Sequence, residues 1–195
     1  MTPYEIITPE SYVSMPWKNG LGTTVELLKE GLPNGSENSF GWRLSMADVT
    51  QDGAFSCFTG YDRTLLLLQG VGMTLDFGQG RTAELNQYLQ STVFRGEDAT
   101  SATLHKGPIK DFNLMTAREH YISRVDSGHS ADEYTLDVDG DVLVIYAPDT
   151  ELHIKSADGG EVSIPSQHLL RMNHPSYQRL VVNGGSFICR SSDLS

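Results

Sequence analysis

The run Asp62-Arg63-Thr64-Leu65-Leu66-Leu67-Leu68-Gln69-Gly70 decides the fold that this sequence predicts. Its apolar centre ends in the turn signal Gly70-Val71-Gly72 and is followed by a second short run, Met73-Thr74-Leu75-Asp76-Phe77. Two such runs joined by a glycine-rich turn predict a pair of antiparallel strands.

Similar short runs, separated by Gly, Asp, Asn and Pro, continue along the chain in both directions, whereas helix signals are scarce. Closely spaced strands with turn signals are typical of an antiparallel sandwich or barrel, so we expect an all-β protein. The expected strands cover residues 40–49, 63–68, 73–77, 87–94, 100–105, 112–115, 133–137, 142–146, 151–154, 161–164, 168–172, 179–182 and 186–190.

The two halves of the chain share this pattern but not their residues. Residues 65–68, a turn and residues 73–77 are echoed by 143–146, a turn and 151–154. We therefore expect two tandem barrels, formed by residues 1–118, which carry a pocket, and residues 119–195, which support it. The polar segment 117–132 should hold the join, with 117–124 as a short helix or a crossing strand.

The bulk composition predicts a globular, cytoplasmic protein. The 195 residues carry a net charge of −11, so nucleic acid and anionic membranes are not expected as partners. No apolar run is long enough to span a bilayer, and the N-terminus shows no signal peptide. Cys57 and Cys189 lack metal-site spacing and are expected to be reduced thiols.

The segment Trp17-Lys18-Asn19-Gly20-Leu21-Gly22-Thr23-Thr24-Val25-Glu26 combines a ring, a cation, an amide, hydroxyls and a carboxylate with two glycines. Glycines permit backbone conformations or close approaches that a side chain would block. Two interpretations stay open at this point: the segment is one wall of a ligand pocket, or it is a turn between two strands.

The run that ends at Gly70 resembles the first cupin motif, in which two histidines and a glutamate bind a metal. Counting back from Gly70 puts Arg63 at the glutamate position and residues 56–59, which contain no histidine, at the histidine positions. Metal sites of this kind need imidazoles and a carboxylate, so we expect no metal and no other cofactor. A guanidinium in that place could grip an organic carboxylate, or it could pair with its neighbour Asp62.

Five segments together resemble the HutD/Ves family, over about the first two thirds of the chain. The resemblance implies a bicupin, two tandem cupin-like (jelly-roll) barrels in one chain without the usual metal ligands. It also implies a link to bacterial histidine utilisation through an intermediate such as urocanate, formylglutamate or formiminoglutamate. The segments are residues 17–26, 42–47, 52–56, 58–63 and 111–116.

The same resemblance places eight side chains around a pocket: Trp17, Asn19, Arg43, Phe55, Phe58, Arg63, Asp111 and Asn113. Arg63 would pair with a ligand carboxylate, and Asn19 and Asn113 would each offer a donor and an acceptor. Asp111 could accept a hydrogen bond from the ligand or orient an arginine.

Strand alternation supports part of this arrangement, because it turns Asp111 and Asn113 to one face and Phe112 to the other. Purely structural alternatives stay open: Phe55 and Phe58 could belong to the hydrophobic core, and Arg43 could face solvent.

Three hypotheses for function follow. The first is a binder of a small carboxylate that senses or governs a pathway. The second is a hydrolase or isomerase with Asp111 or His105 as the acid or base. The third is a structural role in which a homodimer forms through a sheet edge and the pocket is vestigial.

Overall fold

The computed structural model describes residues 3–17, 20, 22–32, 39–130, 133–138, 140–175 and 178–194. These residues form β-strands and one 3-10 turn, η1 (Pro9–Ser11). None of the described residues belongs to a helix long and apolar enough to cross a bilayer. The chain divides into two compact units: the first unit is Tyr12–Tyr121, and the second unit is Met1–Ser11 with Ile122–Ser195.

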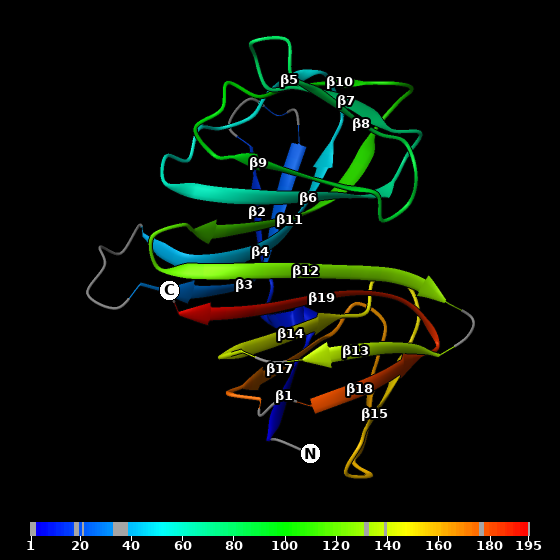
Figure 1. The fold of residues 1–195 in the computed structure, drawn as a ribbon. Helices are drawn as coiled ribbons and strands as arrows, with labels where there is room; N and C mark the ends of the chain where they lie inside the picture. Colours follow the sequence, from blue (N-terminus) through cyan, green and yellow to red (C-terminus); the bar gives the residue numbers. More distant parts are fainter. Residues whose placement is uncertain are drawn as a thin grey trace. The chain divides into compact units, whose positions relative to one another are not determined.

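The first unit contains a six-stranded sheet in the order β2-β3-β4-β11-β6-β9 and a four-stranded sheet in the order β5-β10-β7-β8 (Figure 1). Strands that neighbour each other in these sheets pair antiparallel. Its strands are β2 (Val13–Pro16), β3 (Gly22–Gly31), β4 (Phe40–Val49), β5 (Gly53–Ala54), β6 (Tyr61–Gln69), β7 (Met73–Asp76), β8 (Thr82–Leu85), β9 (Ser91–Arg95), β10 (Ser101–Leu104) and β11 (Ile109–Ala117).

The core of the first unit joins its two sheets. Leu65 and Leu67 of β6 pack in one cluster with Met73 and Leu75 of β7, and all four are at most 1% exposed. The expected strands 63–68 and 73–77 do form, as β6 and β7, but the prediction that they pair with each other is wrong, because β6 belongs to the six-stranded sheet and β7 to the four-stranded sheet. The turn between them carries the chain from one sheet to the other, and alternate leucines of β6 fill the space between the sheets.

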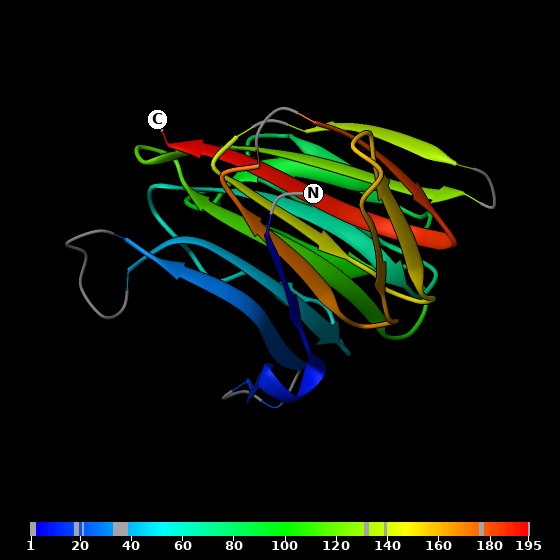
Figure 2. The ribbon, with the colours of Figure 1, turned by 90° about the horizontal axis from the view of Figure 1, so that it is seen from below.

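The second unit also contains two sheets, in the orders β1-β17-β14-β19-β12 and β13-β18-β15-β16. Figure 2 shows β1, the blue N-terminal strand, alongside β17. Its strands are β1 (Tyr4–Ile7), β12 (Tyr121–Ser130), β13 (Tyr134–Val138), β14 (Val142–Tyr146), β15 (Leu152–Ser156), β16 (Glu161–Ile164), β17 (Leu169–Asn173), β18 (Gln178–Asn183) and β19 (Gly185–Leu194).

The expected strands 40–49, 142–146 and 161–164 match β4, β14 and β16 residue for residue. The expected strand 87–94 begins only at Ser91, because the Gln90 side chain accepts hydrogen bonds from the backbone of residues 86 and 87 in a turn. The polar segment 117–132 is mostly strand β12, and the boundary between the two compact units, after Tyr121, falls within this segment as expected. Strands β1, β2, β3, β5 and β8 were not among the expected strands.

The two units differ from the expected ranges 1–118 and 119–195 chiefly at the N-terminus. Residues 4–7 pair with residues 169–172 as β1 and β17, so the first residues of the chain group with the last third. The ranges themselves stay a prediction of domain organisation.

Candidate functional site

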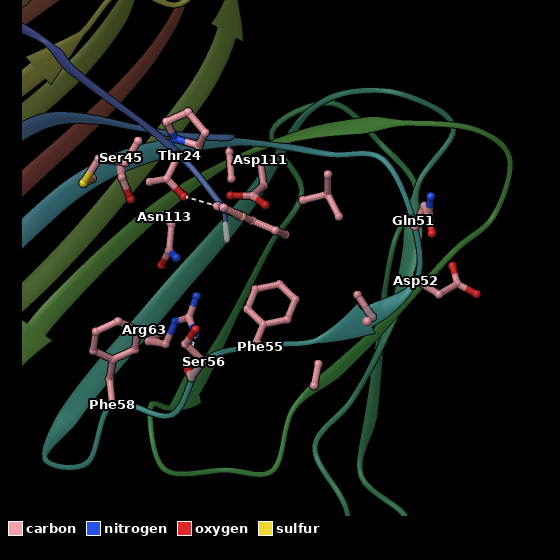
Figure 3. Close-up of a pocket in the computed structure, with 18 of the residues that line it drawn as sticks. Thr24, Ser45, Gln51, Asp52, Phe55, Ser56, Phe58, Arg63, Asp111 and Asn113 are labelled. Carbon is pink, nitrogen blue, oxygen red and sulfur yellow. Dashed lines mark hydrogen bonds between the residues drawn. The ribbon is translucent and has the colours of Figure 1, made fainter. Parts of the chain in front are cut away.

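A cavity of about 540 Å³ lies within the first unit (Figure 3). Every predicted site residue that the structure describes lines it, and Asn19 lies outside the described residues. The lining residues are Met15, Pro16, Trp17, Thr24, Arg43, Ser45, Ala47, Val49, Gln51, Asp52, Gly53, Ala54, Phe55, Ser56, Phe58, Arg63, Ala102, Asp111 and Asn113.

Three adjacent strands of the six-stranded sheet bring the polar lining together. On β11, Met115 lies opposite Arg43 of β4 and Arg63 of β6. Asp111 and Asn113, at every second position of β11, face the cavity, whereas Phe112 is not part of the lining and is 1% exposed. The predicted alternation along this strand is confirmed.

The segment that begins at Trp17 both connects β2 to β3 through a turn and forms part of the cavity wall. The Trp17 N–H donates to the Gly22 carbonyl (2.9 Å), which closes a turn between β2 and β3. Gly20 has a φ of 71°, and a Cβ on Gly22 would lie 2.4 Å from the Asp48 carbonyl oxygen. The Trp17 indole N–H then donates to Thr24 Oγ1 (2.8 Å), and both side chains line the cavity.

Arg63 is buried among aromatic rings rather than paired with an acid. It is 4% exposed, and its guanidinium carbon lies 4.9 Å from the Phe55 ring centroid and 5.0 Å from that of Phe94. Its Nη1 donates to the Ser56 carbonyl (3.5 Å), and its Nε has no hydrogen-bond partner in the described part of the chain. Among the same residues no carboxylate oxygen lies within 4.0 Å of its guanidinium.

The alternative pairing of Arg63 with Asp62 is wrong, because Asp62 accepts from Arg118 Nε at 2.7 Å. Burial lowers the pKa of Arg63 to about 10, although the nearby Asp111 opposes this shift. Arg63 therefore stays cationic at neutral pH in a place where its charge is poorly compensated.

Arg43 also turns toward the cavity, so the interpretation that it faces solvent is wrong. Its guanidinium carbon lies 5.2 Å from the Phe40 ring centroid and 5.4 Å from that of Phe58. Its Nη2 contacts Met115 Sδ at 3.3 Å. Burial lowers the pKa of Arg43, and the charge of Glu26 acts against that shift. Phe58 lies near both arginines, since Arg63 is 5.9 Å from the same ring.

Asp111 and Asn113 supply buried oxygens to the cavity. Asp111 is 1% exposed and Asn113 is 8% exposed. The Oδ1 atoms of both residues have no hydrogen-bond partner among the described residues. Burial raises the pKa of Asp111 to about 7, against the opposing effect of Arg63. Unpartnered buried polar atoms that face one cavity are expected where water or a ligand completes their hydrogen bonds.

Several side chains that line the cavity were not among the predicted site residues. For two of them, the sequence contained a pattern that could have identified them. Ser45 stands two residues from Arg43 on the same strand, so alternation places both on one face. Thr24 lies in the segment that was singled out. Asp52 and Ser56 lie in the segment 52–56 that carries the resemblance, but no strand alternation points them to the cavity, and Gln51 lies outside every such segment.

Two residues that drew attention in the sequence lie elsewhere. His105 is not part of the lining, and its Nε2 lies 2.9 Å from Thr74 Oγ1. The structure therefore does not bring it together with Asp111. Cys57 is exposed and is also absent from the lining.

The residues present do not fit a cupin metal. The described residues contain no group of three or more His, Cys, Asp or Glu side chains that could hold an ion. Arg63 stands at the position of the motif's glutamate, and a guanidinium cannot serve as a ligand.

Comparison with known proteins places this architecture in a family. The HutD family model matches residues 9–190. An uncharacterized 21.2 kDa protein in the hutC 3′ region of Pseudomonas putida is 39% identical over 64% of this chain and 64% of its own length, so the match spans less than two thirds of that relative. Protein Ves of Citrobacter koseri is 31% identical over 84% of this chain and 85% of its own length.

The solved structure of HutD from Pseudomonas fluorescens SBW25 superposes with a TM-score of 0.81 and 28% sequence identity, covering 99% of this chain and 100% of that chain. The all-β fold is cupin-like. On the matches of sequence and structure, this chain belongs to the HutD/Ves family.

Proposed function

We propose that this chain is a metal-free binding protein for a small carboxylate, which Arg63 holds in the cavity of the first unit. The observation that carries the proposal is a guanidinium that is 4% exposed, lines a cavity and has no carboxylate within ion-pair distance among the described residues. Burying a poorly compensated charge is costly, and a ligand carboxylate would reduce that cost with a charge-assisted, bidentate contact.

The ligand that we propose is an intermediate of histidine degradation, such as urocanate, formylglutamate or formiminoglutamate, and the protein would sense it or govern its flux. The support is the HutD family model and a relative in the hutC 3′ region. The pairing of a larger sheet with a four-stranded sheet in each unit supports the further proposal of two tandem cupin-like barrels.

A thermal-shift screen tests the binding proposal. The panel contains the three intermediates, glutamate, histidine and salts of Zn, Ni and Mn. We expect one organic acid to raise the melting temperature of the wild type but not of Arg63→Met, since only the native state binds it.

The matched control is Arg81→Met. Arg81 also stacks on a ring, with 5.6 Å to the Phe77 centroid, but it pairs with Asp98 at 2.9 Å and does not line the cavity. This variant should keep the shift. A shift with a metal salt alone would overturn the proposal.

A second candidate function is an enzyme that acts on such an intermediate, and Asp111 favours it. A buried carboxyl with a pKa near 7 that faces a cavity has the properties of a general acid or base. Conversion of a panel member, followed by NMR and lost in Asp111→Asn, would support catalysis over simple binding.

A further inference from the structure

Asp111 poses a problem for a site that binds anions. It lies on β11 with paired strands on both sides and is 1% exposed, so solvent does not compensate its charge. Its Oδ1 has no hydrogen-bond partner among the described residues, and its side chain faces the same cavity as Arg63. An ionised Asp111 would repel the carboxylate that Arg63 attracts.

The other charged groups around Asp111 do not solve this problem. Arg63 approaches from β6 and Arg43 from β4. The charge of Asp48 on β4 raises the pKa of Asp111, but Asp48 is paired with Lys110 at 3.4 Å and does not line the cavity.

At the far side of the cavity, Asp52 accepts from the Leu104 N–H at 2.7 Å and is exposed. No histidine occurs among the lining residues of the described chain. Arg63 is thus the principal cation that compensates Asp111 before a ligand arrives.

We propose that the cavity takes up one proton with each carboxylate that it binds, and that Asp111 holds this proton. The inference rests on the proposed function. The ligand carboxylate occupies Arg63, and an oxygen of Asp111 takes a proton from solvent to form an O–H bond. The total charge of the site is then unchanged, because the negative charge of Asp111 has been replaced by that of the ligand.

The direction of the pH dependence follows from linkage. Burial already raises the pKa of Asp111 to about 7, and Arg63 holds that pKa down. A ligand that neutralises Arg63 removes this restraint, so the pKa rises further in the complex. Binding is then strongest below the pKa of the free site and weakens above it, by about tenfold between pH 6 and pH 8.

The protonated Asp111 also affects ligand choice. A neutral carboxyl donates one hydrogen bond, so the ligand atom that faces Asp111 should be an acceptor. Asn113 Oδ1, two residues away on the same face, would favour a donor beside that acceptor.

Calorimetry in two buffers counts the protons. Formylglutamate is the probe because neither of its carboxyl groups titrates between pH 6 and pH 8. Its binding enthalpy to the full chain is measured at both pH values in phosphate and in Tris, whose ionisation enthalpies differ. We expect uptake of about one proton at pH 8 and a small fraction at pH 6.

Two variants complete the test. Asp111→Asn should take up no proton at either pH and should bind at pH 8 at least as tightly as the wild type. Asp48→Asn, which removes a neighbouring acid outside the cavity, should keep the proton uptake.

The possible failures are distinguishable. Binding without proton uptake by the wild type, or uptake that persists in Asp111→Asn, overturns this inference and leaves the binding proposal standing. If no carboxylate of the panel binds the wild type, the proposed function fails and this inference fails with it.

Discussion

The two units contain the same kinds of element, but the first unit has a polar cavity beside its packed core. In the second unit, Leu143 and Ile145 of β14 point into a cluster of aliphatic side chains, and both are 0% exposed. In the first unit, the inward positions of β11 include Asp111 and Asn113, which line a cavity.

Their buried polar groups differ as well. In the second unit, Ser156 and Ser186 are buried and donate to Gly160 O (3.1 Å) and Asp149 Oδ2 (2.7 Å). In the first unit, Arg63, Asp111 and Asn113 are buried and each has an atom without a partner among the described residues. Burying polar groups without partners costs stability, and the contrast is the one expected if the first unit binds a ligand as we propose.

The largest change in the free energy of unfolding should come from replacing the buried Asp111. Asp111→Asn should stabilise the protein above pH 7 by about 4 kcal/mol, because the native pKa of about 7 exceeds that of an unfolded aspartate. The unfolded chain ionises first as the pH rises, so the wild type loses stability from about pH 4 to pH 7 and then levels off. Urea unfolding of both proteins from pH 4 to pH 8 measures the difference, and a constant difference would contradict the assignment.

The second largest change in the free energy of unfolding should come from a substitution in the aliphatic cluster of the second unit. Leu143→Ala should lower the free energy of unfolding by about 3 kcal/mol, because it leaves a cavity among packed side chains. Carboxylate binding by the first unit should be unchanged in this variant. Urea unfolding measures the free energy of unfolding, and calorimetry measures the free energy of carboxylate binding. If the two free energies fall by the same amount, the interiors of the two units are not independent.

At pH 5, where Asp111 is protonated and needs no compensating cation, Arg63→Met should raise the free energy of unfolding by about 1–2 kcal/mol. The same variant should abolish carboxylate binding. Replacing a buried, poorly compensated charge by a hydrophobic side chain is often neutral or stabilising. Unfolding in the absence of ligand measures the gain. A marked destabilisation would show that the ring contacts of Arg63 are structural.

The smallest effect concerns a paired arginine of the same unit. Arg118 binds Glu97 through both oxygens and Asp62 through Nε, and its side chain is 32% exposed. Arg118→Ala should cost about 1 kcal/mol, and the cost should shrink in high salt. An effect larger than that of Leu143→Ala would mean that this ion pair, rather than the packed interior, dominates stability.

Most of the strands could be predicted because each strand leaves a pattern in its own short stretch of sequence. Strands β6 and β7 and the alternation of residues 111–113 depend only on the two-residue repeat of a strand, whereas the separate sheets that β6 and β7 join do not. Strand β3 was missed because the polar residues of its first half hide that repeat. The aromatic walls of the site were predicted only through the resemblance, since a phenylalanine in a core and one beside a cavity look the same in sequence.

The sequence by itself determined the all-β class, the arginine at the place of a metal ligand and the shared face of Asp111 and Asn113. Only the tertiary structure decided that Asp62 pairs with Arg118 and not with Arg63, that β1 joins the second unit and that the first unit has a cavity beside its packed core. The reason is that alternation is a property of one strand, whereas ion-pair partners and cavities depend on which distant strands meet.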